Sequence, residues 1–324
     1  MRRYNMREHY ITIVFFLVGI LSYGQKIDHT SSFREMKNES YFRFNYDNDY
    51  FAASDENYTQ GYNLELVLPV FEKNPANLLF FQPKKSENIY GLSVEHIGFT
   101  PNNYESEEIQ FGDRPFSSAI MLKSFLVAKD TVNKSHWVSA LSLGIIGPGA
   151  FGRKMQRSIH EATGNKIPYG WKNQIKNDVV VNYQIGYEKQ LFRYNDFFSL
   201  QGQSEINVGT LFTNAYVGAN ATIGFINYGF SSITNKNRFQ LYAFAQPVMK
   251  IIGYDATLQG GLFNTESVYT ITSKDVERFT RQFNFGLILK TKTLYFEYTR
   301  TSISKEFKSG SKANWGGIKV GFTF

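Results

Sequence analysis

The strongest candidate for catalysis in this chain is a histidine that follows a glutamine by four residues, His160 after Gln156. A turn rich in Gly and Pro precedes them, and the residues around them predict a short polar helix. The four-residue spacing places both side chains on one face of such a helix. A histidine held beside an amide suits general-base catalysis. A lone histidine on a surface helix is more often a solvated side chain, so the spacing by itself leaves both interpretations open.

A second candidate is a group of oxygen-bearing side chains early in the chain. Asn48 and Asp49 stand at the end of the first predicted strand, and the run DENYTQG over residues 55–61 follows them. Clustered carboxylate and amide oxygens suit a hard cation such as calcium. The offsets are not those of an EF-hand loop, and a hairpin rich in Asn and Asp is more often a solvated turn. From chemistry alone, the hairpin is either a cation site or a turn.

A third candidate is Arg114, which lies in the run Asp113-Arg114-Pro115-Phe116 beside a predicted strand. A guanidinium in this place could pair with the phosphate or carboxylate of a ligand. The alternative is a surface pair between Asp113 and Arg114, followed by a proline that ends a loop. Charge and position are the only support for a binding role.

Several familiar catalytic arrangements are excluded. The chain has no cysteine and therefore no thiol nucleophile. It has neither the G-x-S-x-G elbow of α/β-hydrolases nor an HExxH zinc motif. No adjacent motif supplies a Ser-His-Asp triad, although distant residues could assemble one. The chemistry that remains is a water molecule activated by His160, with a nearby cation stabilising the oxyanion.

The start of the chain predicts a secretory signal over residues 1–24. Arg2, Arg3 and Arg7 precede a short apolar run, and small residues suitable for cleavage stand at Ser22 and Gly24. The alternative is a membrane anchor, but the apolar run is shorter than the roughly 20 residues that a spanning helix needs. We therefore expect export and a single mature domain over residues 25–324.

Charge and composition narrow the choice of partner. The signal carries three Arg and one Glu, so its removal lowers the formal charge from +7 to +5. This modest basic excess is compatible with nucleic acid or an anionic membrane. The chain has no nucleic-acid motif and no basic run with interleaved aromatics, which disfavours nucleic acid. We expect a lipid partner.

Apolar and polar residues alternate along most of the mature chain, as in Phe42-Arg43-Phe44-Asn45-Tyr46-Asp47. This period of two predicts β-strands with one apolar and one polar face. Arg43, Asp47, Glu188, Gln201 and Glu205 fall on polar faces that could fill a lumen. About twelve strands are expected, at residues 40–48, 60–70, 88–98, 116–129, 135–146, 177–192, 197–211, 214–228, 238–254, 277–292, 293–304 and 313–324.

The strand pattern favours an outer-membrane β-barrel over a soluble sandwich. Many predicted strands have ten or more residues, whereas strands of soluble sheets average about 5–6. Aromatic residues gather near the strand ends, as in membrane-interface girdles. The chain ends on the alternating run GIKVGFTF, with a terminal Phe324. An even number of antiparallel strands places both termini in the periplasm. We predict an all-β transmembrane barrel with a short extracellular helix, located in the bacterial outer membrane.

In their order and spacing, these segments resemble the outer-membrane lipid A 3'-O-deacylase family, which consists of calcium-dependent enzymes that remove 3'-linked acyl chains. The resemblance covers nearly all of the mature chain. It rests on NDYF and DENYTQG, on TP followed by DRPF, on GPGAFGRKMQRSIHEATG with IPYGWKNQIKN, on YDATLQGG, and on the ending SISKEF…WGGIKVGFTF.

The resemblance implies a twelve-stranded barrel with its active site near the extracellular rim. It implies that His160 is the general base, that Gln156 and Thr59 belong to the catalytic group, and that Asn48 and Asp49 help to hold calcium. The substrate would be lipid A within lipopolysaccharide, and activated water would cut an ester bond. From its charge and position alone, and not from the resemblance, Arg114 is expected to bind the phosphate or sugar of lipid A.

Two positions depart from the family pattern. The usual Asp-Arg-Pro-Tyr-Ala-Gly run is here Asp113-Arg114-Pro115-Phe116-Ser117-Ser118, and a phenylalanine cannot donate a hydroxyl hydrogen bond. The family's acidic residue after the catalytic histidine has no clear counterpart, because Glu161 is adjacent to His160 and Lys166 stands on the following loop. Two other functions fit the strand pattern: a non-enzymatic channel or binding barrel, and an outer-membrane phospholipase with a serine nucleophile.

Overall fold

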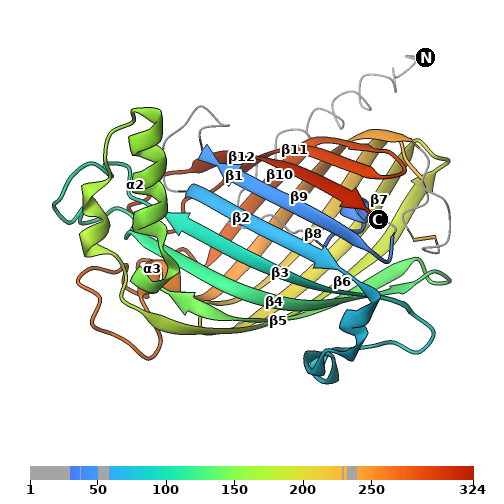
Figure 1. The fold of residues 1–324 in the computed structure, drawn as a ribbon, viewed down its shortest axis with the longest axis horizontal. Coiled ribbons are helices and arrows are strands. Elements are labelled where there is room, and N and C mark those ends of the chain that lie inside the picture. Colours follow the sequence, from blue (N-terminus) through green and yellow to red (C-terminus); the bar gives the residue numbers. More distant parts are fainter. Residues whose placement is uncertain (1–29, 37, 50–57, 228–229, 232–238) are drawn as a thin grey trace, which may run out of the picture.

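The chain folds into a closed β-barrel of twelve antiparallel strands, in which β1 pairs with β12 (Figure 1). The computed structural model describes residues 30–36, 38–49, 58–227, 230–231 and 239–324, without the side chains of residues 58 and 59. The strands are β1 (Tyr41–Asn48), β2 (Tyr58–Val67), β3 (Glu87–Phe99), β4 (Ser117–Asp130), β5 (Ser135–Ile146), β6 (Asp178–Tyr194), β7 (Phe198–Gly209), β8 (Phe212–Phe225), β9 (Gln240–Asp255), β10 (Phe279–Lys290), β11 (Leu294–Ile303) and β12 (Ala313–Thr323).

The predicted fold class and strand number are confirmed. The fifth strand agrees at both ends with the predicted 135–146, and the others differ by a few residues at their ends. Each strand pairs with its neighbours in sequence, and the β1–β12 pair closes the cylinder. A closed barrel leaves no unpaired strand edge, which lets a sheet exist in lipid. The predicted signal over residues 1–24 lies outside the described residues.

Alternation along the strands produces a polar lumen and an apolar outer wall. In β1, Tyr41, Arg43, Asn45 and Asp47 are buried, and the residues between them are half-buried. The Arg43 guanidinium binds Glu65 across the pair of strands, with Nη2 2.8 Å from Oε1. Exposed apolar side chains lie on the opposite face, including Leu122, Leu143, Val181, Val217, Ile251, Leu287 and Phe322.

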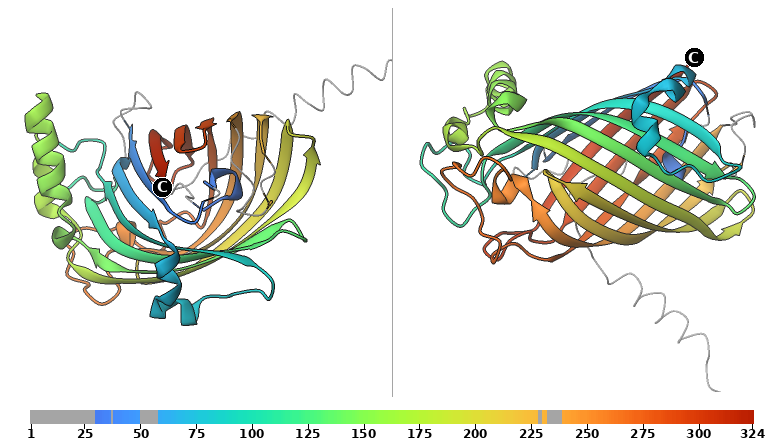
Figure 2. Two further views of the ribbon diagram at one scale, coloured as in Figure 1. Left: turned by 45° about the vertical axis from the view of Figure 1, so that its right-hand side comes forward. Right: turned by 90° about the horizontal axis from the view of Figure 1, so that it is seen from below.

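The N-terminal segment of the described chain lies inside the lumen, which the sequence did not predict. It contains the short 3-10 helix η1 (Ser32–Arg34), drawn in dark blue inside the barrel in Figure 2. The backbone N–H and the hydroxyl of Ser32 donate to Glu188 at 2.8 and 2.5 Å. The Lys290 ammonium donates to the carbonyl oxygens of Phe33 and Glu35, at 2.8 Å each. Strands on opposite sides of the barrel therefore hold this segment in place.

Arg34 is the central charge of this segment and is fully buried. Its Nε donates to Glu297 Oε1 at 2.9 Å, and its guanidinium carbon lies 4.5 Å from the Phe33 ring centre and 5.0 Å from that of Phe244. Lys319 Nζ is 3.2 Å from the same Glu297 oxygen. The buried carboxylate thus has two cationic partners, as a charge removed from water requires.

The two ends of the barrel differ. We call the end that carries both ends of the described chain the terminal end, and the opposite end the helix end. The helix end bears the 3-10 helices η5 (Pro148–Ala150) and η6 (Tyr169–Asn173) and the helices α2 (Gly152–Thr163) and α3 (Ala256–Gln259). Near the terminal end, η3 (Pro69–Lys73) and η4 (Pro75–Leu79) lie outside the wall (Figure 2). Among the described residues, no helix has the length and apolarity to cross a membrane.

Replacing Arg34 by methionine should destabilise the barrel, because Glu297 would lose its closest cationic partner in a site without water. We expect a cost of about 3–5 kcal/mol, the range for breaking a buried pair. The measurement is denaturant unfolding in detergent, followed by heat-modifiable mobility. Arg157→Met is the matched control, because its pair with Glu161 is half-exposed; it should leave the midpoint unchanged. Equal midpoints for both variants would contradict the role given to Arg34.

Candidate active site

The predicted polar helix is present as α2, and its ends explain the glycines of its motif. Phe151 precedes it in the left-handed region at φ 63°, and Gly164 ends it at φ 72°, donating to the carbonyl of His160. At the start of the helix, a Cβ on Gly152 would lie 2.5 Å from Ser118 and 2.8 Å from Trp171. Only glycine permits this approach to β4. The sequence thus sets α2 against the outer side of the wall, where Figures 1 and 2 show it.

His160 is half-exposed in the last turn of α2, and one of its ring nitrogens is held by the backbone. Its Nδ1 lies 2.6 Å from the carbonyl oxygen of Lys166. Because a carbonyl only accepts, this contact requires the proton on Nδ1. The neutral ring then presents an unprotonated Nε2, and among the described residues the ring's hydrogen bond is the one at Nδ1. Nε2 is therefore available as a base.

The loop between β3 and β4 also contacts His160, through Tyr104. The rings of Tyr104 and His160 meet edge to face, with their centres 5.5 Å apart. Glu105 pairs with Lys166 at 2.7 Å, and Glu107 pairs with Lys172 at 2.6 Å. The Lys172 ammonium lowers the pKa of the Glu107 carboxyl. These contacts join the two loops that flank the imidazole.

Gln156 lies one turn before His160 but is buried, and its carbonyl oxygen accepts a hydrogen bond from the Trp171 indole N–H. Trp171 in turn packs on Phe116, with ring centres 5.1 Å apart. This arrangement explains the run PYGW that follows the helix, because the tryptophan of this run, in η6, is hydrogen-bonded to α2. Gln156 therefore positions the helix, and its catalytic role stays a prediction.

A row of outward-facing rings on the wall connects β1 to the base of α2. Tyr46, Tyr62 and His96 occupy matching positions on β1, β2 and β3. The ring centres of Tyr46 and Tyr62 are 4.9 Å apart, and those of Tyr62 and His96 are 6.2 Å apart. His96 Nε2 lies 3.0 Å from the carbonyl oxygen of Ala150. Tyr46 also interacts electrostatically with Asp49. The tip of β1 and the base of α2 are thus linked along the wall.

The predicted cation ligands are only partly described. Asn48 ends β1 half-buried, and the Asp49 side chain is buried beside it. Thr59 lies in β2, but its side chain is outside the described residues, as are residues 55–57 of the same hairpin. Within the part of the chain that the structure describes, no three His, Asp or Glu side chains are grouped to hold a metal. Calcium binding stays a prediction.

Arg114 is buried at the mouth of the lumen. It forms an ion pair with Glu306, donates to Thr257 Oγ1 at 2.7 Å, and lies 4.0 Å above the Phe99 ring centre. Burial raises the pKa of the Glu306 carboxyl to about 7, although the Arg114 guanidinium opposes this shift. The guanidinium thus joins three separate parts of the chain at the helix end. Its predicted contact with substrate stays a prediction, and we assign no catalytic step to it.

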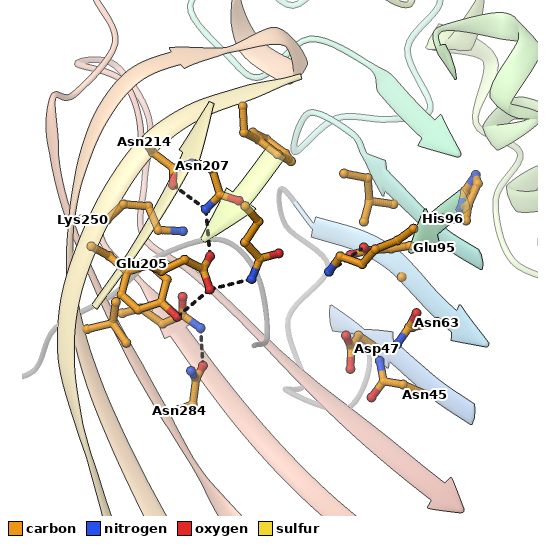
Figure 3. A pocket seen from close by; sticks show the side chains of 18 of the residues that line it. Asn45, Asp47, Asn63, Glu95, His96, Glu205, Asn207, Asn214, Lys250 and Asn284 are labelled. Atoms are coloured by element: carbon orange, nitrogen blue, oxygen red, sulfur yellow. Dashed lines mark hydrogen bonds and ion pairs between the residues drawn. The ribbon is translucent and has the colours of Figure 1, made fainter. Parts of the chain in front are cut away.

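The lumen contains a pocket lined mainly by polar residues, with about 990 Å³ of unfilled space that includes open solvent (Figure 3). Asn45, Asp47 and Asn63 line one wall of it, and Glu205 lies on the other. Glu205 accepts hydrogen bonds from Gln184, Tyr216 and Asn207 at 2.7, 3.1 and 2.8 Å. His160 is not among the lining residues. Tyr62 and His96 border the cavity as well, so it extends to the part of the wall beneath the base of α2.

The barrel is closed, with a polar lumen and an apolar outer wall, and it carries a histidine on a helix outside this wall. Such a barrel is typical of an outer-membrane protein of the β-barrel class. The family model described as outer membrane protein LpxR matches residues 11–324. The chain belongs to this family.

Two solved structures place the fold in context. LpxR from Salmonella typhimurium superposes with a TM-score of 0.73 at 18% identity, covering 88% of this chain and 100% of that one. The β domain of the Bordetella autotransporter BrkA gives a TM-score of 0.45 at 6% identity, covering 88% and 98% of the two chains. A comparison with curated proteins finds no match. The first superposition confirms the predicted barrel fold.

The family confirms the predicted location in the bacterial outer membrane. In bacterial outer-membrane barrels with an even number of strands, the chain ends lie in the periplasm and the longer loops outside. The terminal end is therefore periplasmic and the helix end extracellular. Helix α2, with His160, lies at this extracellular end.

Three contributions to the site were not predicted. Tyr104 and the Lys166 carbonyl contact His160, and His96 supports the helix from the wall. The family pattern predicts an acidic side chain after His160. The adjacent acidic residue, Glu161, instead pairs with Arg157 at 2.8 Å. A backbone acceptor leaves no signature in side-chain types. His96 had a signal, because a histidine at an outward position of a membrane strand is unusual.

Replacing Trp171 by phenylalanine should loosen α2 without disturbing the barrel. The variant keeps an aromatic ring but leaves the buried Gln156 oxygen without a donor, at a cost of about 1–3 kcal/mol. We expect faster amide hydrogen exchange across residues 152–163, with protection of the strands unchanged. The control is Trp137→Phe, on the wall away from α2. Identical exchange of the helix in both variants would argue against the indole as its fastening.

Proposed function

We propose that this protein is an outer-membrane esterase that removes 3'-linked acyl chains from lipid A. Membership of the LpxR family supports this proposal, together with the resemblance of its motifs to lipid A 3'-O-deacylases. The observation that carries it is the Nδ1 contact of His160 with the Lys166 carbonyl, which leaves Nε2 as a proton acceptor. The helix carries this acceptor on the membrane side of the barrel wall, where a lipid substrate is within reach.

The proposed reaction is hydrolysis through a water molecule. Nε2 of His160 takes a proton from water, and the resulting hydroxide attacks the ester carbonyl carbon. The Lys166 carbonyl holds the opposite N–H and stabilises the imidazolium that forms. When the tetrahedral intermediate breaks down, the imidazolium returns the proton to the departing sugar hydroxyl. The products are a fatty acid and lipid A with a free 3'-hydroxyl.

The outer wall favours a lipid substrate over a soluble one. On the helix-end half of β4, β5 and β6, exposed apolar side chains on the outer wall include Leu122, Leu143 and Val179. Acyl chains could therefore remain in the bilayer beside the wall while the headgroup reaches α2. The N-terminal segment in the lumen, held by Glu188 and Glu297, argues against the alternative of an open channel.

The donor chemistry of the β1 tip fits calcium, which the resemblance implies. Asp49 offers a buried carboxylate and Asn48 an amide oxygen, and hard oxygen ligands are those that calcium prefers. These two residues would hold the ion, with Thr59 nearby in the sequence. When bound, calcium would supply positive charge close to the oxyanion. The negative charge of Asp49 would raise the affinity of this site for calcium.

Replacing His160 by alanine should reduce lipid A deacylation by about 10²–10⁴-fold, the usual contribution of a general base. The measurement is mass spectrometry of lipid A incubated with purified protein in detergent and calcium, where the loss of a 3' acyl or acyloxyacyl group is read directly. Glu161→Gln is the matched control on the same helix and should keep full activity. Full activity of His160→Ala, with the barrel folded, would refute the assigned base.

Replacing Asp49 by asparagine should raise the calcium concentration needed for half-maximal activity by tenfold or more, because the ion would lose a charged ligand. A chelator should abolish activity of the unchanged protein, and added calcium should restore it. Asp275→Asn, in the β9–β10 loop, serves as the control. The calcium assignment fails if the chelator has no effect or if both variants titrate like the parent.

A further inference from the structure

The connection between β2 and β3 folds back against the outside of the barrel. We call residues 68–86 the wall loop. It contains η3 and η4 and appears in teal outside the strands near the terminal end in Figures 1 and 2. Phe80 is buried against Leu126 and Ala128 of β4, and Phe81 packs edge to face on Trp137 of β5 at 4.8 Å. These partners occupy outward positions of their strands, so the loop covers membrane-facing wall.

Polar groups on this part of the wall are matched by the loop. Asn74 Nδ2 donates to Ser124 Oγ at 3.3 Å, and the Phe81 N–H donates to Ser139 Oγ at 3.2 Å. The Tyr183 hydroxyl donates to the carbonyl of Leu79 at 2.8 Å. Hydroxyls on a lipid-facing wall would otherwise lack partners in hydrocarbon. The wall beneath the loop is therefore built to receive it.

Burial changes sharply along the same strands. Leu126 is fully buried under the loop. Leu122, four residues closer to the helix end on the same face of β4, is 52% exposed. Because Leu122 lies near the middle of β4, the loop occupies the terminal-end half of the wall. In the outer membrane this half lies at the level of the periplasmic leaflet.

The wall loop exposes several apolar side chains beside the polar Glu72, Lys73 and Gln82, and its backbone polar groups are largely paired. The N–H groups of Asn77 and Phe80 bond within the loop at 3.0 and 3.2 Å, and the Asn77 amide donates to the carbonyls of Phe71 and Glu72. Internal pairing is what hydrocarbon requires of a backbone. The exposed apolar side chains are Val70, Leu78, Leu79 and Phe81, of which Leu78 is 90% exposed.

Basic side chains stand where the loop returns to the barrel. Lys84 and Lys85 are exposed just before β3 begins at Glu87, at the terminal end, and Lys73 is exposed at the last residue of η3, next to the exposed Glu72. An apolar surface bordered by lysines matches acyl chains bordered by phosphate groups. The same surface is continuous with the apolar wall of the barrel.

We propose that the wall loop is embedded in the periplasmic leaflet of the outer membrane and binds its phospholipids. Leu78 and Leu79 lie among the acyl chains, and Lys84 and Lys85 contact the phosphates. The loop thereby anchors the barrel to phospholipid on the leaflet opposite α2. This assignment is independent of the proposed esterase activity, because it involves neither His160 nor the helix end.

The absence of cysteine from the chain permits a direct test with single spin labels. Leu78→Cys is labelled in nanodiscs of phosphatidylethanolamine and phosphatidylglycerol that hold one barrel each. Accessibility to oxygen, which partitions into lipid, is compared with accessibility to a water-soluble nickel complex. Leu122→Cys provides the reference for membrane-facing wall, and Val132→Cys, 86% exposed on the β4–β5 turn, the reference for water. Leu79→Cys repeats the measurement at a second exposed position.

We expect the oxygen-to-nickel ratio at Leu78 to resemble that at Leu122 and to exceed the ratio at Val132 several-fold. A ratio like that of Val132 would place the loop in water and overturn the proposal. Protection from both reagents would indicate a covering protein, such as a second copy of the chain, and would also overturn it. Deacylase activity of the labelled protein does not enter either outcome.

Discussion

The ion pair between Arg34 and Glu297 shows the constraint on which the rest of the barrel depends. A strand in lipid has one face on which charge is tolerable, so the charged residues of this chain gather in the lumen, where water is scarce. Each must find a partner of opposite sign or a hydrogen bond. The N-terminal segment supplies several of these partners from inside. The barrel is therefore a packed cylinder whose interior stabilises it, and not a wall around an empty pore.

The lumen holds structural contacts, and the proposed catalytic histidine lies on a helix outside the wall. Helix α2 is set against the wall by the close approach at Gly152, the indole of Trp171 and the contact of His96 with Ala150. The two flanking loops are joined through Lys166–Glu105 and Lys172–Glu107. These loop pairs are exposed and individually weak. The buried contacts at the base hold the helix, and the two flanking loops contact the histidine in its last turn.

Most of the barrel could be predicted from sequence because lipid imposes a strict alternation with a period of two. The run from Phe42 to Asp47 shows this alternation without a break, and β5 was predicted to the residue. The helix was predicted from the turn rich in Gly and Pro before it and from the polar residues around Gln156 and His160. The 3-10 helix η1 was not, because three residues have no periodicity and their contacts are with strands more than 150 positions away.

The site was less predictable than the fold. His160 and Gln156 were found from their types and spacing, but the neighbours of the imidazole, Tyr104 and the Lys166 carbonyl, come from loops with no repeating pattern. Arg114 was predicted to lie beside a strand start, and its charge suggested that it binds a ligand. Its burial against Glu306 and Phe99 depends on the closure of the barrel, which brings β3 and the β11–β12 loop together and which local sequence does not encode.

The orientation of the imidazole by a main-chain oxygen has a consequence for how this site can diverge. Every amino acid carries the same carbonyl, so position 166 can change its side chain freely while the tautomer of the histidine is preserved. What must be kept is the path of the chain after Gly164, since a shift of one residue in that reversal would aim a different peptide group at the ring. Natural variants of this protein should therefore tolerate substitution at this position and resist insertion or deletion between the helix and η6.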